Sequence, residues 1–236
     1  SGVEVYGEVL SFKTLLPLYD KQTDLDIASA IDLSSSGSAN CYIISESGLY
    51  KFRTTKGNSQ VSVGNVASAS MIWETFGTSV APEKFDLISE FCYKDGFIVF
   101  KTSDSFKEGN ALLAAKDAKG EILWSWHIWF TDQPKEQVYF NNAGILMDRN
   151  IGATSATPGD VGALGLMYQW GRKDPFLGSS TTKFEDFTYA ESTITWPAHV
   201  YSDLVYGTIE YTIAHPTTLI LQEDDDKLDW YYSNIR

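Results

Sequence analysis

The feature that most constrains this chain is the concentration of large aromatic rings between Gly120 and Phe176. Each buried indole removes roughly 150–250 Å² from water and needs a complementary wall to pack against. A run such as ILWSWHIWF therefore predicts a specific, closely packed core. Four of the seven tryptophans lie in this segment, namely Trp124, Trp126, Trp129 and Trp170.

Apolar residues that alternate with polar ones predict short β-strands along the first half of the chain. Glycine-containing turns between these runs favour hairpins, because glycine accepts a positive φ. The pattern predicts an antiparallel β-sandwich over residues 25–134, with an N-terminal strand or linker over residues 1–24. The predicted strands are residues 41–44, 49–52, 70–74, 88–93, 97–101, 110–116 and 122–130, and the predicted hairpin turns lie at Gly48, Asp95-Gly96, Glu108-Gly109 and Lys119-Gly120.

A polar break separates this region from a second one, residues 135–236, which is richer in glycine and in short aromatic clusters. A short helix is predicted there over residues 163–170, ended by Gly171. Residues 207–221 leave two alternatives open, a helical turn interrupted at Pro216 or two strands, because β-branched residues are frequent. The expected fold class is mainly β, with an α+β second domain.

The charge balance argues against nucleic acid as a binding partner. The chain has 18 Lys and Arg against 31 Asp and Glu, a net charge of −13, and shows no basic stripe that would bind a nucleic-acid backbone. No apolar stretch is long enough to predict a membrane-spanning helix. The two cysteines, Cys41 and Cys92, lie in predicted strands, and free buried thiols are favoured over a disulfide.

Three ordered blocks carry a resemblance to a known family. They read GEILWSWHIWFTD, MDRNIGA and YQWGRKDPF. Their order resembles that of surface proteins from Bacteroides-type bacteria, which join a fimbrillin-like β-sandwich to a domain similar to the Fibrobacter-type major paralogous domain. The segment SANCYIISESGLYKF also resembles the opening of that sandwich, so the resemblance extends from about residue 30 to residue 236.

The resemblance implies a C-type lectin-like fold for the second domain and a location at the cell surface, in the outer membrane or outside the cell. In the family, a segment like DWYYSN at residues 229–234 continues into a Cys-Pro-x-Gly-Trp stretch, so we expect this domain to be incomplete at its C-terminus. The expected role is adhesion or fimbrial assembly. The partners would be a glycan or protein receptor or neighbouring pilus subunits, and a lipid anchor upstream of Ser1 is compatible with this role.

Several residues in these blocks are interpreted as structural. His127 has no second ligand candidate at metal spacing, which favours a hydrogen bond in the core, and His199 and His215 are equally isolated. An aspartate beside an arginine in a turn favours an ion pair that fixes the loop. The residues given this structural role are Trp124, Trp126, His127, Trp129, Asp148, Arg149, Asn150, Arg172 and Asp174.

Sugar binding by a protein of a polysaccharide-use system is the sharper alternative, because exposed aromatic rings stack on pyranose faces. A carbohydrate-active enzyme is a further alternative, although the sequence carries no catalytic motif and the adjacent Glu185 and Asp186 would fall on opposite faces of a strand. The acidic run from Glu223 to Asp226 lacks the spacing of a calcium loop, so no metal and no other cofactor is expected. The candidate ligand-binding residues are Tyr168, Trp170, Trp196 and Trp230.

Overall fold

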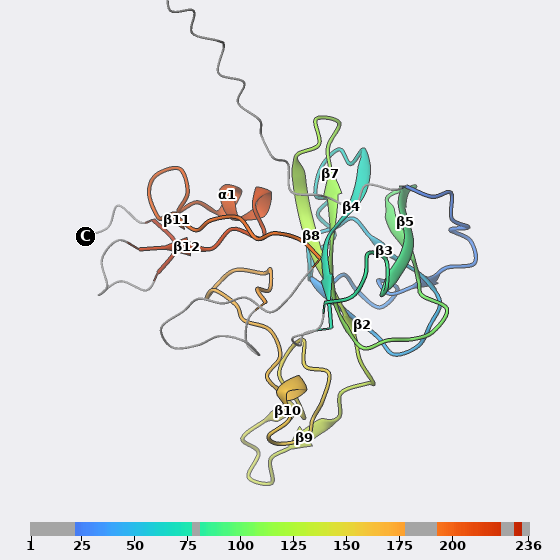
Figure 1. The fold of residues 1–236 in the computed structure, drawn as a ribbon, viewed down its shortest axis with the longest axis vertical. Coiled ribbons are helices and arrows are strands. Elements are labelled where there is room, and N and C mark those ends of the chain that lie inside the picture. The colour runs from blue at the N-terminus through green and yellow to red at the C-terminus, as the bar shows by residue number, and fades with distance from the viewer. Residues whose placement is uncertain (1–21, 77–80, 178–192, 223–228, 233–236) are drawn as a thin grey trace, which may run out of the picture.

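The computed structural model describes residues 22–76, 81–177, 193–222 and 229–232. Two four-stranded sheets face each other in it (Figure 1). One sheet has the strand order β1-β3-β6-β5 and the other the order β2-β8-β7-β4. The strands are β1 (Ile31–Asp32), β2 (Cys41–Ile44), β3 (Leu49–Arg53), β4 (Ser68–Thr75), β5 (Ile88–Lys94), β6 (Phe97–Thr102), β7 (Gly109–Lys116) and β8 (Ile122–Phe130).

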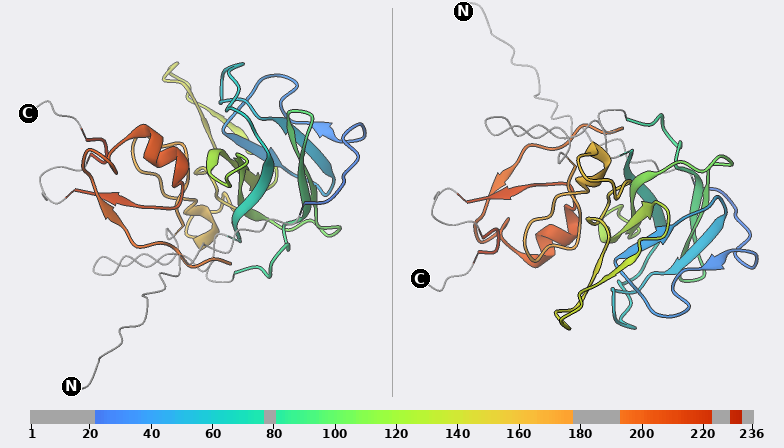
Figure 2. Two further views of the ribbon diagram at one scale, coloured as in Figure 1. Left: turned by 90° about the horizontal axis from the view of Figure 1, so that it is seen from above. Right: turned by 90° about the horizontal axis from the view of Figure 1, so that it is seen from below.

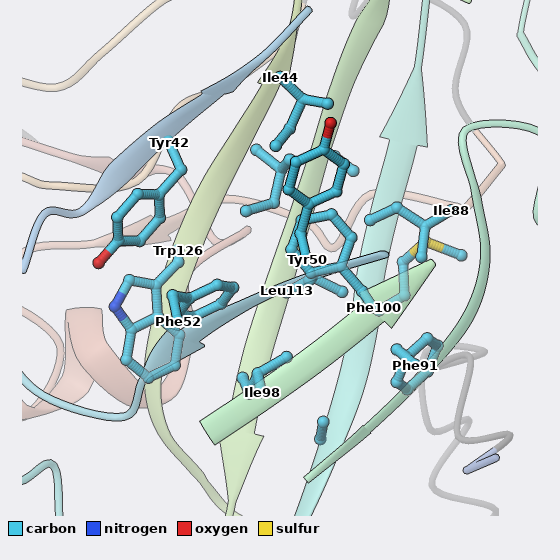
Figure 3. Packing of buried hydrophobic residues seen from close by; sticks show 14 of the residues in the cluster. Tyr42, Ile44, Tyr50, Phe52, Ile88, Phe91, Ile98, Phe100, Leu113 and Trp126 are labelled. Carbon is cyan, nitrogen blue, oxygen red and sulfur yellow. The ribbon is translucent and has the colours of Figure 1, made fainter. Parts of the chain in front are cut away.

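The main core lies between these sheets and follows the period-two alternation of the strands (Figure 3). Trp126 and Ile128 point inward from β8, and Phe52 and Phe100 meet them from the opposite sheet. The ring centroids of Phe52 and Trp126 lie 5.2 Å apart at an interplanar angle of 54°, a geometry that aromatic pairs favour. The expected mainly-β fold is confirmed.

The strand β2 does not form a hairpin with β3. It pairs in parallel with β8, whereas β3 pairs antiparallel with β6 and parallel with β1. Residues 45–48 cross from one sheet to the other, so that Tyr42 and Tyr50 enter the core from opposite sides. The alternation of apolar residues determines which face of a strand is buried, but it does not determine which strand pairs with it. The predicted hairpin turn at Gly48 is therefore wrong, and the sandwich contains both parallel and antiparallel strand pairs.

The predicted hairpin turn at Glu108-Gly109 is also wrong, because β6 and β7 belong to different sheets. Gly109 is the first residue of β7, and a Cβ added there would lie 2.5 Å from the carbonyl oxygen of Thr75. Glycine is therefore required here for a close backbone approach. The other two predicted hairpins, β5–β6 and β7–β8, are confirmed by their antiparallel pairing.

The described chain beyond residue 134 forms short elements. The predicted helix over residues 163–170 is wrong, because only a single 3₁₀ turn forms, with Asp160 as its N-cap. The turn ends before Gly165, whose φ of 73° lies in the left-handed region and cannot continue a right-handed helix. The elements are β9 (Glu136–Val138), β10 (Ile145–Met147), η1 (Val161–Ala163), β11 (Val200–Tyr201), α1 (Ile209–Ala214) and β12 (Ile220–Leu221).

Residues 207–221 combine the two alternatives left open by the sequence. Thr208 caps the helix α1, with its side chain accepting a hydrogen bond from the Tyr211 amide at 3.2 Å. The helix ends before Pro216, and β12 follows and pairs in parallel with β11. A helix and a strand therefore share this segment.

The second region packs on the outer face of the sheet β2-β8-β7-β4 (Figure 2). Leu177 and Ile194 form a second core cluster with Trp73 and Leu112 from β4 and β7. This sheet is consequently covered on both faces, which explains why β7 is buried along its whole length. The assignment of this region to a C-type lectin-like fold stays a prediction.

Candidate functional site

The side chains of β8 that face away from the sandwich core form a row, Ser125, His127 and Trp129, which fixes the second region to the sandwich. The Ser125 hydroxyl donates to Asp174 at 2.7 Å, and the Trp129 indole donates to the carbonyl oxygen of Ala153 at 2.9 Å. All of these residues are buried. Trp126 therefore packs in the core of the sandwich, whereas Trp129 is buried on the opposite face of β8, where its indole bonds to Ala153.

His127 belongs to the same row and is hydrogen-bonded on both ring nitrogens. Its Nε2 lies 2.8 Å from Oδ1 of Asn110, whose amide nitrogen donates to the carbonyl oxygen of Gly152 at 2.9 Å. Because Oδ1 is then an acceptor, Nε2 carries the proton and Nδ1 accepts from the Cys41 thiol at 3.2 Å. Burial lowers the pKa of His127 to about 3, so the ring is neutral.

The thiol of Cys41 is held protonated, because burial raises its pKa to about 12. A protonated thiol is a poor nucleophile and a poor metal ligand. Both Cys41 and Cys92 are free, as the sequence predicts. Among the described residues no group of three His, Cys, Asp or Glu side chains is arranged to hold a metal ion.

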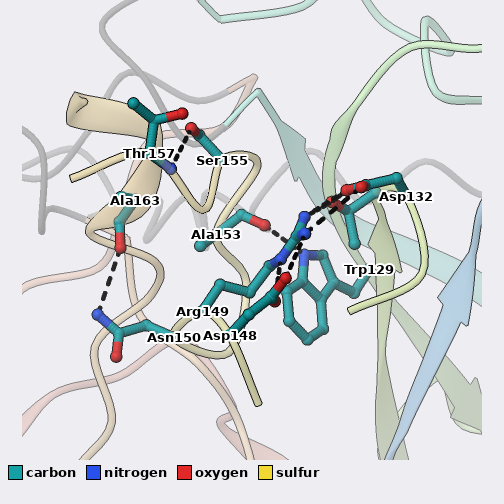
Figure 4. Close-up of polar contacts among 10 residues, drawn as sticks. Trp129, Asp132, Asp148, Arg149, Asn150, Ala153, Ser155, Thr157 and Ala163 are labelled. Atoms are coloured by element: carbon teal, nitrogen blue, oxygen red, sulfur yellow. Dashed lines mark hydrogen bonds and ion pairs between the residues drawn. The ribbon is translucent and has the colours of Figure 1, made fainter. Parts of the chain in front are cut away.

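Arg149 forms the second anchor (Figure 4). Its guanidinium donates to Asp148 at 2.8 Å, pairs with Asp132 at the end of β8, and donates to the Thr131 hydroxyl at 3.0 Å. Asn150 continues the anchor by donating to two carbonyl oxygens of the η1 turn region. The ion pair expected for Asp148 and Arg149 is therefore present, and hydrogen bonds from Arg149 hold the pKa values of Asp132 and Asp148 below their usual range.

A cleft of about 360 Å³ lies where β8, the loop after Trp170 and the helix α1 meet. This volume is within the range of small-molecule binding sites. Its walls combine aromatic rings with a few polar groups, as such sites commonly do. The lining residues are Asn40, Trp124, Gly171, Arg172, Lys173, Asp174, Ile209, Thr212, Ile213, Trp230 and Tyr231.

Hydrogen bonds hold the indole rings of this cleft in place. Trp124 donates to Oδ1 of Asn40 at 3.1 Å, and Trp230 donates to the carbonyl oxygen of Trp170 at 2.5 Å. Tyr231 completes the aromatic set and is half-exposed. Side chains fixed in this way are preorganised, because little conformational entropy is lost when a ligand binds.

The cleft also contains charged groups. Lys173 donates to both carboxylate oxygens of Asp174, at 2.7 and 2.8 Å, and its ammonium lies 4.6 Å from the Trp124 ring centroid. Burial lowers the pKa of Lys173. Asp174 is the single carboxylate among the described residues that line the cleft, whereas glycoside hydrolysis normally uses two.

Arg172 holds the helix side of the cleft. Its guanidinium donates to the carbonyl oxygens of Thr218 at 2.7 Å and His215 at 3.2 Å, just beyond the C-terminus of α1. The helix predicted over residues 163–170 does not form, so the carbonyls that Arg172 satisfies belong to the segment after α1.

The structure separates the four predicted ligand-binding residues. Trp230 lines the cleft and is 7% exposed, and Trp170 stands beside the lining residue Gly171 with 94% of its surface exposed. Tyr168 is partly exposed and does not line the cleft. Trp196 packs against Trp73 and Phe176, at ring-centroid distances of 6.3 and 6.1 Å, so it belongs to the interface between the two regions.

Sequence reasoning missed several residues of the cleft. Asn40 and Lys173 lie in the blocks SANCYIISESGLYKF and YQWGRKDPF but were given no binding role, and their proximity to Trp230 follows only from tertiary packing. Trp124, assigned a purely structural role, also lines the cleft. The pair Glu185-Asp186 and the acidic run from Glu223 to Asp226 lie outside the described residues.

A separate exposed surface is formed by the hairpin β9–β10, which projects from the body (Figure 1). Residues 137–147, QVYFNNAGILM, contain no charged residue. Phe140 near its tip is fully exposed, and Val138 and Leu146 are also largely exposed. Exposed apolar side chains clustered in this way mark contact surfaces for other molecules.

No family model, curated protein or solved structure matches this chain. Among the described residues no helix is long and apolar enough to cross a membrane. The cleft and the projecting hairpin are the two features of the described chain that indicate a function.

Proposed function

We propose that this chain is a cell-surface adhesion protein that binds a glycan in the cleft between β8, the loop after Trp170 and α1. The observation that carries the proposal is the combination of Trp124, Trp230 and Tyr231 with hydrogen-bonding groups in a space of about 360 Å³. Aromatic rings provide flat apolar faces for a pyranose, and polar groups beside them select its hydroxyls. The side-chain amide nitrogen of Asn40 supplies a donor for those hydroxyls, because the Oδ1 of the same amide already accepts from the Trp124 indole and the Gly57 amide.

A glycan-array screen of the full chain tests the proposal, with Tyr231→Ala as the site variant. Both Tyr231 and Tyr139 are half-exposed, but Tyr139 belongs to the hairpin segment and not to the cleft. Tyr139→Ala is therefore the matched control. Loss of about tenfold or more in affinity, roughly 1.4 kcal/mol, is expected for Tyr231→Ala alone.

The second candidate function is adhesion or fimbrial assembly through the hairpin β9–β10. The specific observation in its favour is the uncharged, exposed apolar segment around Phe140. Its strands pair with each other, and neither has another strand partner among the described residues, so an incoming strand from a protein partner finds free main-chain groups. Under this function the array is silent, and Tyr139→Ala reduces adhesion while Tyr231→Ala does not.

A further inference from the structure

The charges of the ionisable groups that line the cleft do not sum to zero. Lys173 and Asp174 compensate each other, since the ammonium donates to both carboxylate oxygens. Arg172 is the remaining charged residue of the lining. The cleft therefore carries one uncompensated positive charge, although the chain as a whole has a net charge of −13.

Arg172 is a buried cation without a hydrogen bond to a carboxylate among the described residues, and its guanidinium carbon lies 4.9 Å from the Phe176 ring centroid. It is 8% exposed, and its hydrogen bonds within the described residues go to neutral oxygens of Gln169, Thr218 and His215. Its Nε is buried and has no hydrogen-bond partner in that part of the chain. Burial lowers the pKa of Arg172 to about 10, because the surroundings supply too little negative charge to offset desolvation.

A second cation lies at the aromatic wall of the cleft. The ammonium of the exposed Lys56 is 5.4 Å from the Trp124 ring centroid, on the sandwich side. A site that concentrates positive charge on an otherwise acidic protein attracts anions selectively, because the field of the site opposes that of the surrounding surface. An anionic group in the cleft would supply the charge that Arg172 lacks.

We infer that the cleft selects glycans that carry an anionic group on the ring bound there, a carboxylate or a sulfate. This inference rests on the proposed glycan-binding function. Charge-assisted hydrogen bonds from a guanidinium to an oxyanion are shorter and stronger than those between neutral groups. A neutral sugar leaves the buried charge of Arg172 uncompensated, and an acidic sugar compensates it.

Paired ligands test the inference without altering the protein. Affinities of the full chain are measured for uronic-acid oligosaccharides and their methyl esters, for sialyllactose and lactose, and for a sulfated glycan and its desulfated form. We expect the charged member of at least one pair to bind about tenfold or more tightly in 50 mM NaCl, and the preference to shrink in 500 mM NaCl as charges are screened. The type of pair that shows the preference distinguishes a carboxylate from a sulfate.

A variant locates the charge that is responsible. Lys56→Gln is expected to reduce the preference for the charged ligand, whereas Lys119→Gln, which removes an exposed lysine from the β7–β8 turn, leaves it unchanged. Arg172→Gln should abolish the preference if circular dichroism shows that it remains folded. Equal affinity for both members of every pair would overturn the anionic selection and leave glycan binding intact. Absence of binding to any member would contradict both proposals.

Discussion

At the scale of single residues, the buried carboxylate of Glu74 depends on several backbone hydrogen bonds of the sandwich. It accepts backbone N–H groups from residues 85–88, at 2.5 to 3.5 Å, and is fully buried. Burial raises its pKa to about 7 despite these donors. The folded state therefore binds a proton more tightly than the unfolded chain, so the contribution of Glu74 to stability falls as pH rises from 4.5 to 7.

Replacing Glu74 by Gln tests this environment. At pH 5 we expect the variant to lose about 2 kcal/mol of unfolding free energy, because the amide nitrogen faces backbone donors. The wild type then loses about 2 kcal/mol between pH 5 and pH 7 that the variant does not lose, so the difference shrinks. Urea unfolding at both pH values measures it, with the exposed Glu121→Gln as control. A difference that grows with pH would contradict the expected direction.

His127 changes the stability of the fold with pH in the direction opposite to that of Glu74. Its folded pKa lies below that of a free imidazole, so the unfolded chain binds the extra proton and stability falls as pH drops from 6.5 toward 3. We expect His127→Gln to remove this acid sensitivity while losing about 1–3 kcal/mol at pH 7 through imperfect hydrogen bonds to Asn110. Acid-induced unfolding followed by tryptophan fluorescence measures both effects. An unchanged acid midpoint in the variant would show that His127 is not buried as described.

At the scale of elements, the strands of the sandwich were predictable and their partners were not. Alternating apolar residues identify β5 to β8 to within a residue or two. The same alternation cannot distinguish a hairpin from a crossing between sheets. The hairpin turns predicted at Gly48 and Gly109 are wrong for this reason. The helix expected at residues 163–170 fails because one left-handed glycine, Gly165, outweighs a favourable apolar spacing.

The candidate site was only partly predictable for a related reason. Composition identifies Trp170 and Trp230 as aromatic candidates, but packing decides that one is exposed and the other lines a cleft. Asn40 and Lys173 are distant in the sequence and meet only because the second region covers β8. No local sequence pattern predicts that these two residues line the same cleft.

The second region packs on the sheet through Leu177, so a substitution at this residue tests the contact. Leu177 is fully buried against Trp73 and Leu112, so we expect Leu177→Ala to lose about 2–4 kcal/mol through lost burial and a residual cavity. Leu204, which is 68% exposed, is the matched control, and Leu204→Ala should change stability by less than about 0.5 kcal/mol. Equal effects of the two substitutions in chemical unfolding would refute this contact.

At the scale of the whole molecule, the two regions share one interface, and the sheet β2-β8-β7-β4 belongs to both. Because Trp73 and Trp129 are buried by the second region, we expect a fragment of residues 25–134 to expose them. The fragment should bind a hydrophobic dye that the full chain does not bind, and it should unfold at a lower temperature. A fragment that is as stable as the full chain and does not bind the dye would show that the sandwich is independent of its partner region.

The proposed function requires that a glycan binds in the cleft rather than elsewhere on the surface. Nuclear magnetic resonance of the indole N–H signals tests it most directly, with the best ligand from the array titrated into ¹⁵N-labelled protein. We predict that the signals of Trp124 and Trp230 shift with a common affinity while those of the buried Trp126 and Trp129 do not. A bound glycan that leaves the Trp124 and Trp230 signals unmoved would show that the cleft is not its binding site.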